Sequence, residues 1–114
     1  MSRLQISATF SIHEGKLDEF KTHVPKYIER VRDLDTQTEA YDWFLSPDGT
    51  SCEVREIYPS SEALLDHIGH VGDLFPDTLA IADLAIKVYG EPSAELVEAT
   101  KEMDVVGFSF LAGA

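Results

Sequence analysis

The stretch that decides the fold runs from Thr38 to Tyr58 and reads TEAYDWFLSPDGTSCEVREIY. Its first part is rich in aromatic and β-favouring residues, and its last part alternates between apolar and polar positions. Between them lies the segment SPDGT, in which Pro47 presets the first turn angle and Gly49 accepts a positive φ. The pattern predicts a β-hairpin with strands over residues 38–45 and 51–58.

The residues before this hairpin predict a strand followed by a long helix. Apolar and polar side chains alternate from Leu4 to Ile12, which is the period of a half-buried strand. From Leu17 to Leu34, apolar residues recur at steps of three and four, as in an amphipathic helix. Pro25 lies inside that pattern. Because proline lacks an amide hydrogen and crowds the preceding turn, we expect either a kink or two short helices.

The residues after the hairpin predict a second helix, shorter helical pieces and two more strands. Ser60 or Ser61 can cap the second helix, and two glycines weaken it after Ile68. The segments that follow are a short helix over residues 77–84, a strand over 84–90, a helix over 92–101 and an uncharged strand over 105–111.

The predicted elements follow one another as β-α-β-β-α-β, with an extra helix and strand at the C-terminus. This order is typical of a ferredoxin-like α+β fold, and we expect a single domain over residues 1–114. Helices on one face of the sheet leave the other face in need of a cover, and the uncharged last strand would be a hazard as a free edge. Pairing of two chains solves both problems, so we expect a homodimer. Whether the last strand pairs within its own chain or crosses to the partner stays open.

The composition excludes several classes of function. The 114 residues include 9 Lys and Arg against 21 Asp and Glu, and this net charge of −12 would repel nucleic acid and anionic membranes. No apolar run is long enough to span a bilayer and residues 1–5 lack the core of a signal peptide, so we expect a cytoplasmic protein. The single cysteine, Cys52, excludes an internal disulfide and indicates a small side chain that is buried or half-buried.

Three segments of the sequence resemble the antibiotic biosynthesis monooxygenase-like family. They are GKLDEFKTHVPKYIERVR, YDWFLSPDGTSCEVREIYPSSEALLDHI and KVYGEPSAEL. In this family a strand ends in Glu-x-Tyr or Glu-x-Trp and is followed by a helix that begins Ser/Asp-Glu-Ala-Leu-x-x-His. Here these motifs stand at Glu56–Tyr58 and Ser61–His67, and the likeness covers most of residues 4–97.

The resemblance implies a dimeric α/β barrel with a pocket between sheet and helices. It also implies an oxidoreductase, a monooxygenase that oxidises a small aromatic phenol or quinol with dioxygen and without cofactor or metal. The alternatives are a non-catalytic small-molecule-binding dimer and a haem-binding or haem-degrading relative. The Asn and Trp that better-understood members carry on the second helix are absent here, so their catalytic roles do not carry over.

Two histidines of the second helix, His67 and His70, are the first candidates for a site. At about 100° per residue, His67 falls about 60° from Leu64, at the border of the apolar stripe, and His70 lies about 120° away. His67 therefore points to the seam between helix and sheet. It is either a structural histidine bonded to a backbone carbonyl or a base that accepts a phenolic proton. His70 is more solvated and remains a candidate for substrate binding, while H-x-x-H alone is a weak metal signal.

Glu56 is the second catalytic candidate. It shares a strand face with Val54, where a buried carboxylate needs a partner. The partner is either a Lys or Arg in a cross-strand ion pair, or His67, which Glu56 would orient or relieve of a proton. The remaining histidines, His13 and His23, have the pattern of surface positions.

Aromatic residues around the hairpin complete the candidate site. They are either core and dimer interface or the lining of a cavity for a flat aromatic molecule. Alternation places Tyr41 and Trp43 on one face of their strand and Phe44 on the other. The expected substrate-binding residues are Tyr41, Trp43, Phe44, Tyr58 and His70.

Overall fold

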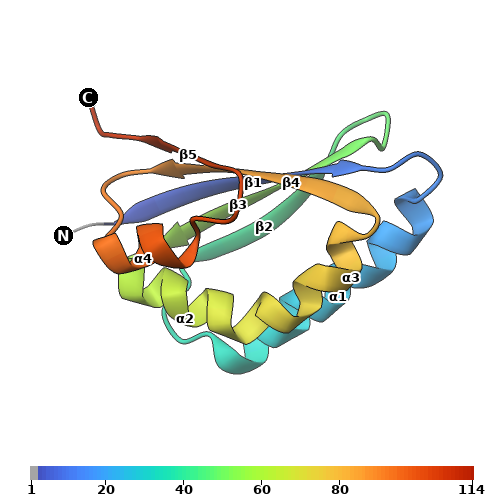
Figure 1. Cartoon of the computed structure of the whole chain (residues 1–114), viewed down its shortest axis with the longest axis horizontal. Helices are drawn as coiled ribbons and strands as arrows, with labels where there is room; N and C mark the ends of the chain where they lie inside the picture. Colours follow the sequence, from blue (N-terminus) through green and yellow to red (C-terminus); the bar gives the residue numbers. More distant parts are fainter. Residues whose placement is uncertain (1–2) are drawn as a thin grey trace.

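The computed structural model describes residues 3–114 and has one five-stranded sheet with helices on one of its faces (Figure 1). The strands are β1 (Leu4–Ile12), β2 (Ala40–Leu45), β3 (Ser51–Tyr58), β4 (Ala82–Tyr89) and β5 (Val105–Phe108). The helices are α1 (Leu17–Leu34), α2 (Ser61–Val71), the 3-10 turn η1 (Gly72–Leu74), α3 (Phe75–Leu79) and α4 (Ala94–Ala99). This order confirms the ferredoxin-like α+β fold with an added helix and strand.

The sheet has the strand order β2-β3-β1-β4-β5, and every neighbouring pair is antiparallel except β4 and β5. The last strand pairs with β4 of its own chain and ends at Phe108, three residues before its predicted end. The register places Glu56 between Tyr41 of β2 and Ile6 of β1, in one row across the inner face. The neighbouring row includes Ala8, so a small side chain lies near the centre of the sheet.

The predicted hairpin forms as expected. The backbone N–H of Ser46 donates to the carbonyl of Ser51 at 2.8 Å, and Gly49 closes the turn with a φ of 73°. The first strand of the hairpin, β2, begins at residue 40 instead of the predicted residue 38. Trp43 points toward the helices, whereas Phe44 lies on the outer face and is 56% exposed. The alternation read from the sequence is therefore confirmed.

The first helix is one continuous element that contains Pro25 in its interior, so the alternative of two short helices is wrong. Pro25 lies on the exposed side, and buried residues before and after it, Phe20 and Tyr27, hold both turns against the core. The proline therefore removes one backbone hydrogen bond without separating the two halves.

The surface position expected for His23 is also wrong, since this residue is 9% exposed. Its Nδ1 lies 2.8 Å from the Thr78 hydroxyl on α3, which also accepts a hydrogen bond from the Tyr27 hydroxyl. The short helix α3 covers this part of α1, and the periodicity of α1 alone cannot reveal such a contact. His13 is exposed, as predicted, with its Nε2 3.1 Å from Asp83.

The second helix begins as predicted, because the Ser60 hydroxyl accepts the backbone N–H of Ala63 at 3.1 Å. It does not weaken after Ile68 but continues through Gly69 to Val71. The short helix α3 ends before residue 80, and β4 starts two residues earlier than predicted. Among residues 3–114, no helix combines the length and apolar character that a membrane span requires.

Candidate functional site

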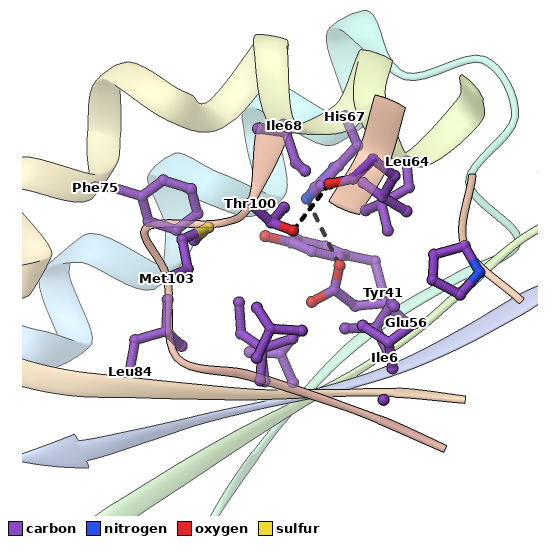
Figure 2. A pocket seen from close by; sticks show the side chains of 18 of the residues that line it. Ile6, Tyr41, Glu56, Leu64, His67, Ile68, Phe75, Leu84, Thr100 and Met103 are labelled. Carbon is purple, nitrogen blue, oxygen red and sulfur yellow. Dashed lines mark hydrogen bonds and ion pairs between the residues drawn. The ribbon is translucent and has the colours of Figure 1, made fainter. Parts of the chain in front are cut away.

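A cavity of about 330 Å³ lies beneath α2, between the helices and the inner face of the sheet (Figure 2). The sheet contributes its floor, α2 contributes Leu64 and Ile68, and the segment from α4 to β5 closes it with residues such as Met103. Figure 2 places the His67–Glu56 pair at one end and Phe75 and Met103 at the other. The hollow expected beneath the second helix is therefore present, and its lining is mainly apolar.

His67 points inward and is 5% exposed, between two carboxyl groups. Its Nδ1 lies 2.8 Å from Oδ2 of Asp35, and its Nε2 lies 3.7 Å from Oε1 of Glu56. Because an ionised carboxylate can only accept, we assign the ring hydrogen to Nδ1, which leaves the Nε2 lone pair on the side of Glu56. The partners are carboxyl groups and not the backbone carbonyl that a purely structural histidine would use.

Asp35 is the residue that the sequence did not reveal. It follows the last turn of α1, its side chain is 4% exposed, and it accepts hydrogen bonds from Thr38, His67 and His70. Burial raises its pKa, but the hydrogen bonds from Thr38, His70 and His67 outweigh burial and hold the pKa below its usual range. Asp35 is therefore an anion that orients His67.

His67 is a neutral base under ordinary conditions. Burial lowers its pKa, since a charged imidazolium would lose its hydration, and the contact with Asp35 opposes this effect. His70 adds a further lowering through its charge. The balance is a pKa below the usual value, so the imidazole keeps a free lone pair.

Glu56 lies on the inner face of β3 and is 8% exposed. Its Oε1 accepts a hydrogen bond of 2.6 Å from the Tyr58 hydroxyl. Among the described residues, no Lys or Arg pairs with Glu56, so the expectation of a cross-strand ion pair is wrong. Burial raises its pKa to about 7, and the charge of Asp35 adds to the effect while the Tyr58 bond opposes it. Near neutral pH this carboxyl group can both give and take a proton.

The aromatic candidates separate into three groups. Tyr41 and Trp43 line the cavity, and the Tyr41 ring meets the His67 ring edge to face at 5.0 Å between centroids. Tyr58 lies behind the cavity wall, fully buried against Glu56 and His67. Phe44 has no contact with the cavity, because its position in β2 turns it to the outer face. Burial raises the pKa of Tyr41 and of Tyr58, so both hydroxyls stay protonated.

His70 does not lie on the cavity wall. Its side chain is 31% exposed, and its Nδ1 lies 2.6 Å from the Oδ1 atom of Asp35. The three-residue step from His67 rotates His70 toward the solvent side of α2. The structure therefore brings His70 to the site through Asp35 and not through contact with the cavity.

Two further expectations concern sulfur and metal. Cys52 is 4% exposed and burial raises its pKa to about 11, so it is the small buried side chain that was predicted. In residues 3–114, no group of three or more His, Cys, Asp and Glu side chains is arranged to hold a metal ion.

The comparison with known proteins rests on solved structures, because no protein-family model and no curated protein matches this chain. MupZ from Pseudomonas fluorescens superposes with a TM-score of 0.86 at 21% identity, over 100% of this chain and 94% of that one. Rv0793 from Mycobacterium tuberculosis gives 0.69 at 22% identity, over 76% and 92%. An antibiotic biosynthesis monooxygenase gives 0.67 at 21% identity, over 80% and 98%.

The three matches differ in how much of this chain they include. MupZ matches the full length, while the other two leave 24% and 20% of this chain outside the superposition, from coverages of 76% and 80%. Identities of 21 to 22% speak for the fold and not for the reaction. This chain therefore has the ferredoxin-like fold of the antibiotic biosynthesis monooxygenase-like structures, as the resemblance of its sequence indicated.

Proposed function

We propose that this protein is an enzyme that removes a proton from a small aromatic molecule in the cavity, and that it oxidises a phenol or quinol with dioxygen without a cofactor. One observation carries the proposal: a buried neutral imidazole, His67, is held through Nδ1 by Asp35, and its free Nε2 lies at the cavity. A carboxylate that orients a histidine in this way is a recurring arrangement for a general base.

The proposed reaction begins at His67. Its Nε2 accepts the phenolic proton, and Asp35 stabilises the imidazolium that forms. The phenolate passes one electron to dioxygen, and the resulting phenoxyl radical and superoxide combine at a ring carbon to give a hydroperoxide after proton uptake. Loss of water from the hydroperoxide leaves a carbonyl group. Phenol and dioxygen thus become quinone and water, so the electrons balance without an external reductant.

The cavity supports this chemistry through its size and its lining. About 330 Å³ lies within the range of about 300–1,000 Å³ that small-molecule sites occupy. Apolar residues such as Ile6, Ala8 and Ile86 exclude water, which keeps His67 neutral and strengthens its interaction with Asp35. Protonated Glu56 is placed to supply a proton to the departing hydroxide.

A second candidate function is proton transfer without oxidation, for example the enolisation of a ketone. The favouring observation is the position of Glu56, a carboxyl group with a pKa of about 7 whose Oε1 lies 3.7 Å from His67. A neighbouring acid and base can remove a proton at one atom and return one at another. The two candidates differ in whether dioxygen is consumed.

Oxygen uptake by metal-stripped protein with phenols and quinols of one to three rings tests the first candidate. We expect one dioxygen per quinone formed, and a rate lower by about 100-fold or more in His67→Ala. Turnover that persists without oxygen would favour the second candidate. A rise in Tm with aromatic ligands but no turnover would identify a binding protein, and a Soret shift with haem would identify a haem-binding one.

We also propose that two copies of the chain associate through the outer face of the sheet. Large apolar side chains are exposed there and on the adjoining tail: Phe44, Tyr89, Val106, Phe108, Phe110 and Leu111. Tyr89 and Phe108 stack at 5.4 Å between centroids. Association with a second copy would remove these apolar side chains from water. Light scattering tests it, and a concentration-independent monomer mass would contradict the proposal.

A further inference from the structure

The buried carboxylate of Asp35 lies between two imidazoles. Its Oδ2 faces Nδ1 of His67 at 2.8 Å, and its Oδ1 faces Nδ1 of His70 at 2.6 Å. The Thr38 hydroxyl also donates to Oδ2. Within the part of the chain described here, no Lys or Arg pairs with Asp35. Asp35 also caps the C-terminal end of α1, where the helix dipole disfavours a negative charge.

A buried anion of this kind attracts a proton to its surroundings. A carboxylate removed from water needs a compensating positive charge, or it gives up its own charge. The ionised state of Asp35 therefore favours protonation of a neighbouring imidazole as the pH falls. His67 and His70 both contact this carboxylate, so either ring could take that proton.

The two imidazoles differ in what a charge would cost. The side chain of His67 is 6% exposed and is enclosed by Glu56, Tyr41 and Tyr58, so a charge there loses most of its hydration. The side chain of His70 is 31% exposed and keeps contact with water. A proton at His70 therefore gains the same carboxylate partner at a lower desolvation cost.

The charged groups around His70 are consistent with a proton there. On α1, Arg30 donates to the backbone carbonyl of His70 at 2.6 Å, and its charge is paired with Asp73 at 2.6 Å. Asp66, on α2 itself, lines the same small hollow as His70 and Asp35. The acidic groups near His70, Asp66 and Asp73, thus offset the charge of Arg30.

We propose that His70 takes up the first proton that Asp35 attracts, and that it thereby keeps His67 neutral with Nε2 free. His70 is then a positioning residue, which acts on the cavity through Asp35 without touching a bound molecule. The assignment of the proton stands on the cluster alone, whereas its effect on turnover rests on the proposed function.

Removal of His70 is expected to change the pH at which His67 becomes protonated. With His70 absent, the proton attracted by Asp35 has His67 as its remaining imidazole. The removal also ends the lowering effect that the His70 charge has on the pKa of His67. Both effects act in one direction: His67 becomes protonated at a higher pH, and the free base is lost in the mildly acidic range.

NMR titration of the imidazole rings tests the proposal without any substrate. In the wild-type chain, the ring resonances of His70 are expected to titrate at higher pH than those of His67, with the Nδ1-protonated tautomer at His67. In His70→Gln, which keeps a hydrogen-bond donor but no charge, the His67 midpoint is expected to move to higher pH. His70→Lys, which restores a cation, is expected to move it back. The matched control is His13→Gln, because His13 is an exposed histidine paired with Asp83. This substitution is expected to leave the His67 midpoint unchanged.

Two results would overturn the proposal. A wild-type titration in which His67 takes the first proton overturns it, and this measurement needs no variant to fold. A His67 midpoint that stays in place or moves to lower pH in His70→Gln also overturns it. If the titration order holds but no substrate turns over, the proposed function fails and the proton assignment survives.

Discussion

Two buried histidines, His23 on α1 and His67 on α2, have different surroundings. His23, between α1 and α3, is 9% exposed and faces the neutral hydroxyl of Thr78 at 2.8 Å. His67, between α2 and the sheet, is 5% exposed and faces carboxyl groups on both sides. The first is an internal link between two helices, and the second lies at a cavity. Burial alone therefore does not single out His67 as the candidate base; the charge of its partners and the open space beside it do.

The largest expected effect compares the two histidines directly. His67→Gln is expected to lower kcat by about 100-fold or more, because an amide cannot accept the substrate proton. His23→Gln is expected to leave kcat within about twofold and to lower the free energy of unfolding by about 1–3 kcal/mol, because it disturbs a buried hydrogen bond. Steady-state kinetics and urea unfolding measure the two effects. Equal losses of activity in both variants would remove the distinction.

The second prediction concerns the partner that distinguishes His67. Asp35→Asn is expected to lower kcat by about 100-fold, because a neutral amide neither fixes the tautomer of His67 nor stabilises its charged form. The matched change on the other histidine, Thr78→Val, is expected to affect stability and not kcat. Normal kcat in Asp35→Asn would show that the carboxylate has no part in orienting the base.

The lowered pKa of Asp35 also makes the stability of the folded chain depend on pH. Its pKa in the folded chain is below the ordinary value of 3.8, so the folded state binds this proton less tightly than the unfolded state does. Its contribution is therefore present above pH 3.8 and is lost as the pH falls through the lower, folded-state value. Thermal unfolding of wild type and Asp35→Asn between pH 2 and 6 measures it, and parallel curves would contradict it.

The contribution of Glu56 to stability depends on pH in the opposite direction. Burial raises its pKa from 4.5 to about 7, so the folded state holds this proton more tightly than the unfolded state does. Its contribution is present below pH 4.5 and is lost as the pH rises to about 7. Glu56→Gln is expected to remove this decline, so its Tm gains on wild type between pH 5 and 8. A difference in Tm that stays constant over this range would refute the raised pKa.

The smallest expected effect concerns the helix that carries both imidazoles of the site. Gly69 is helical and a Cβ at this position would meet nothing within 4 Å. Gly69→Ala is therefore expected to stabilise the chain by about 0.5–1 kcal/mol, with activity unchanged. Gly49→Ala is the contrasting change, since its φ of 73° and the Leu17 side chain at 2.8 Å both oppose a methyl group. Urea unfolding of the two variants measures the difference.

Features that depend on residues close together in the sequence were predicted better than features that depend on contacts between distant segments. The hairpin, the cap at Ser60 and the inward position of His67 all depend on residues close together in the chain, and the structure has each of them. Asp35 was missed because it lies in a loop and meets His67 across 32 residues of sequence. The burial of His23 was missed for the same reason, since Thr78 lies 55 residues away. Periodicity describes one element at a time, and a site assembled between elements is outside its reach.

The cavity draws one of its walls and its candidate reactive groups from separate stretches of the chain. Asp35, Glu56 and His67 all precede residue 70, whereas the closing wall comes from the segment between Pro92 and Gly107. The candidate reactive groups and this one wall of the cavity are thus encoded in different parts of the gene. Under the proposed function, exchange or mutation of the C-terminal segment would change which compounds fit while Asp35, Glu56 and His67 stay in place, so a new specificity could arise without loss of the proposed base.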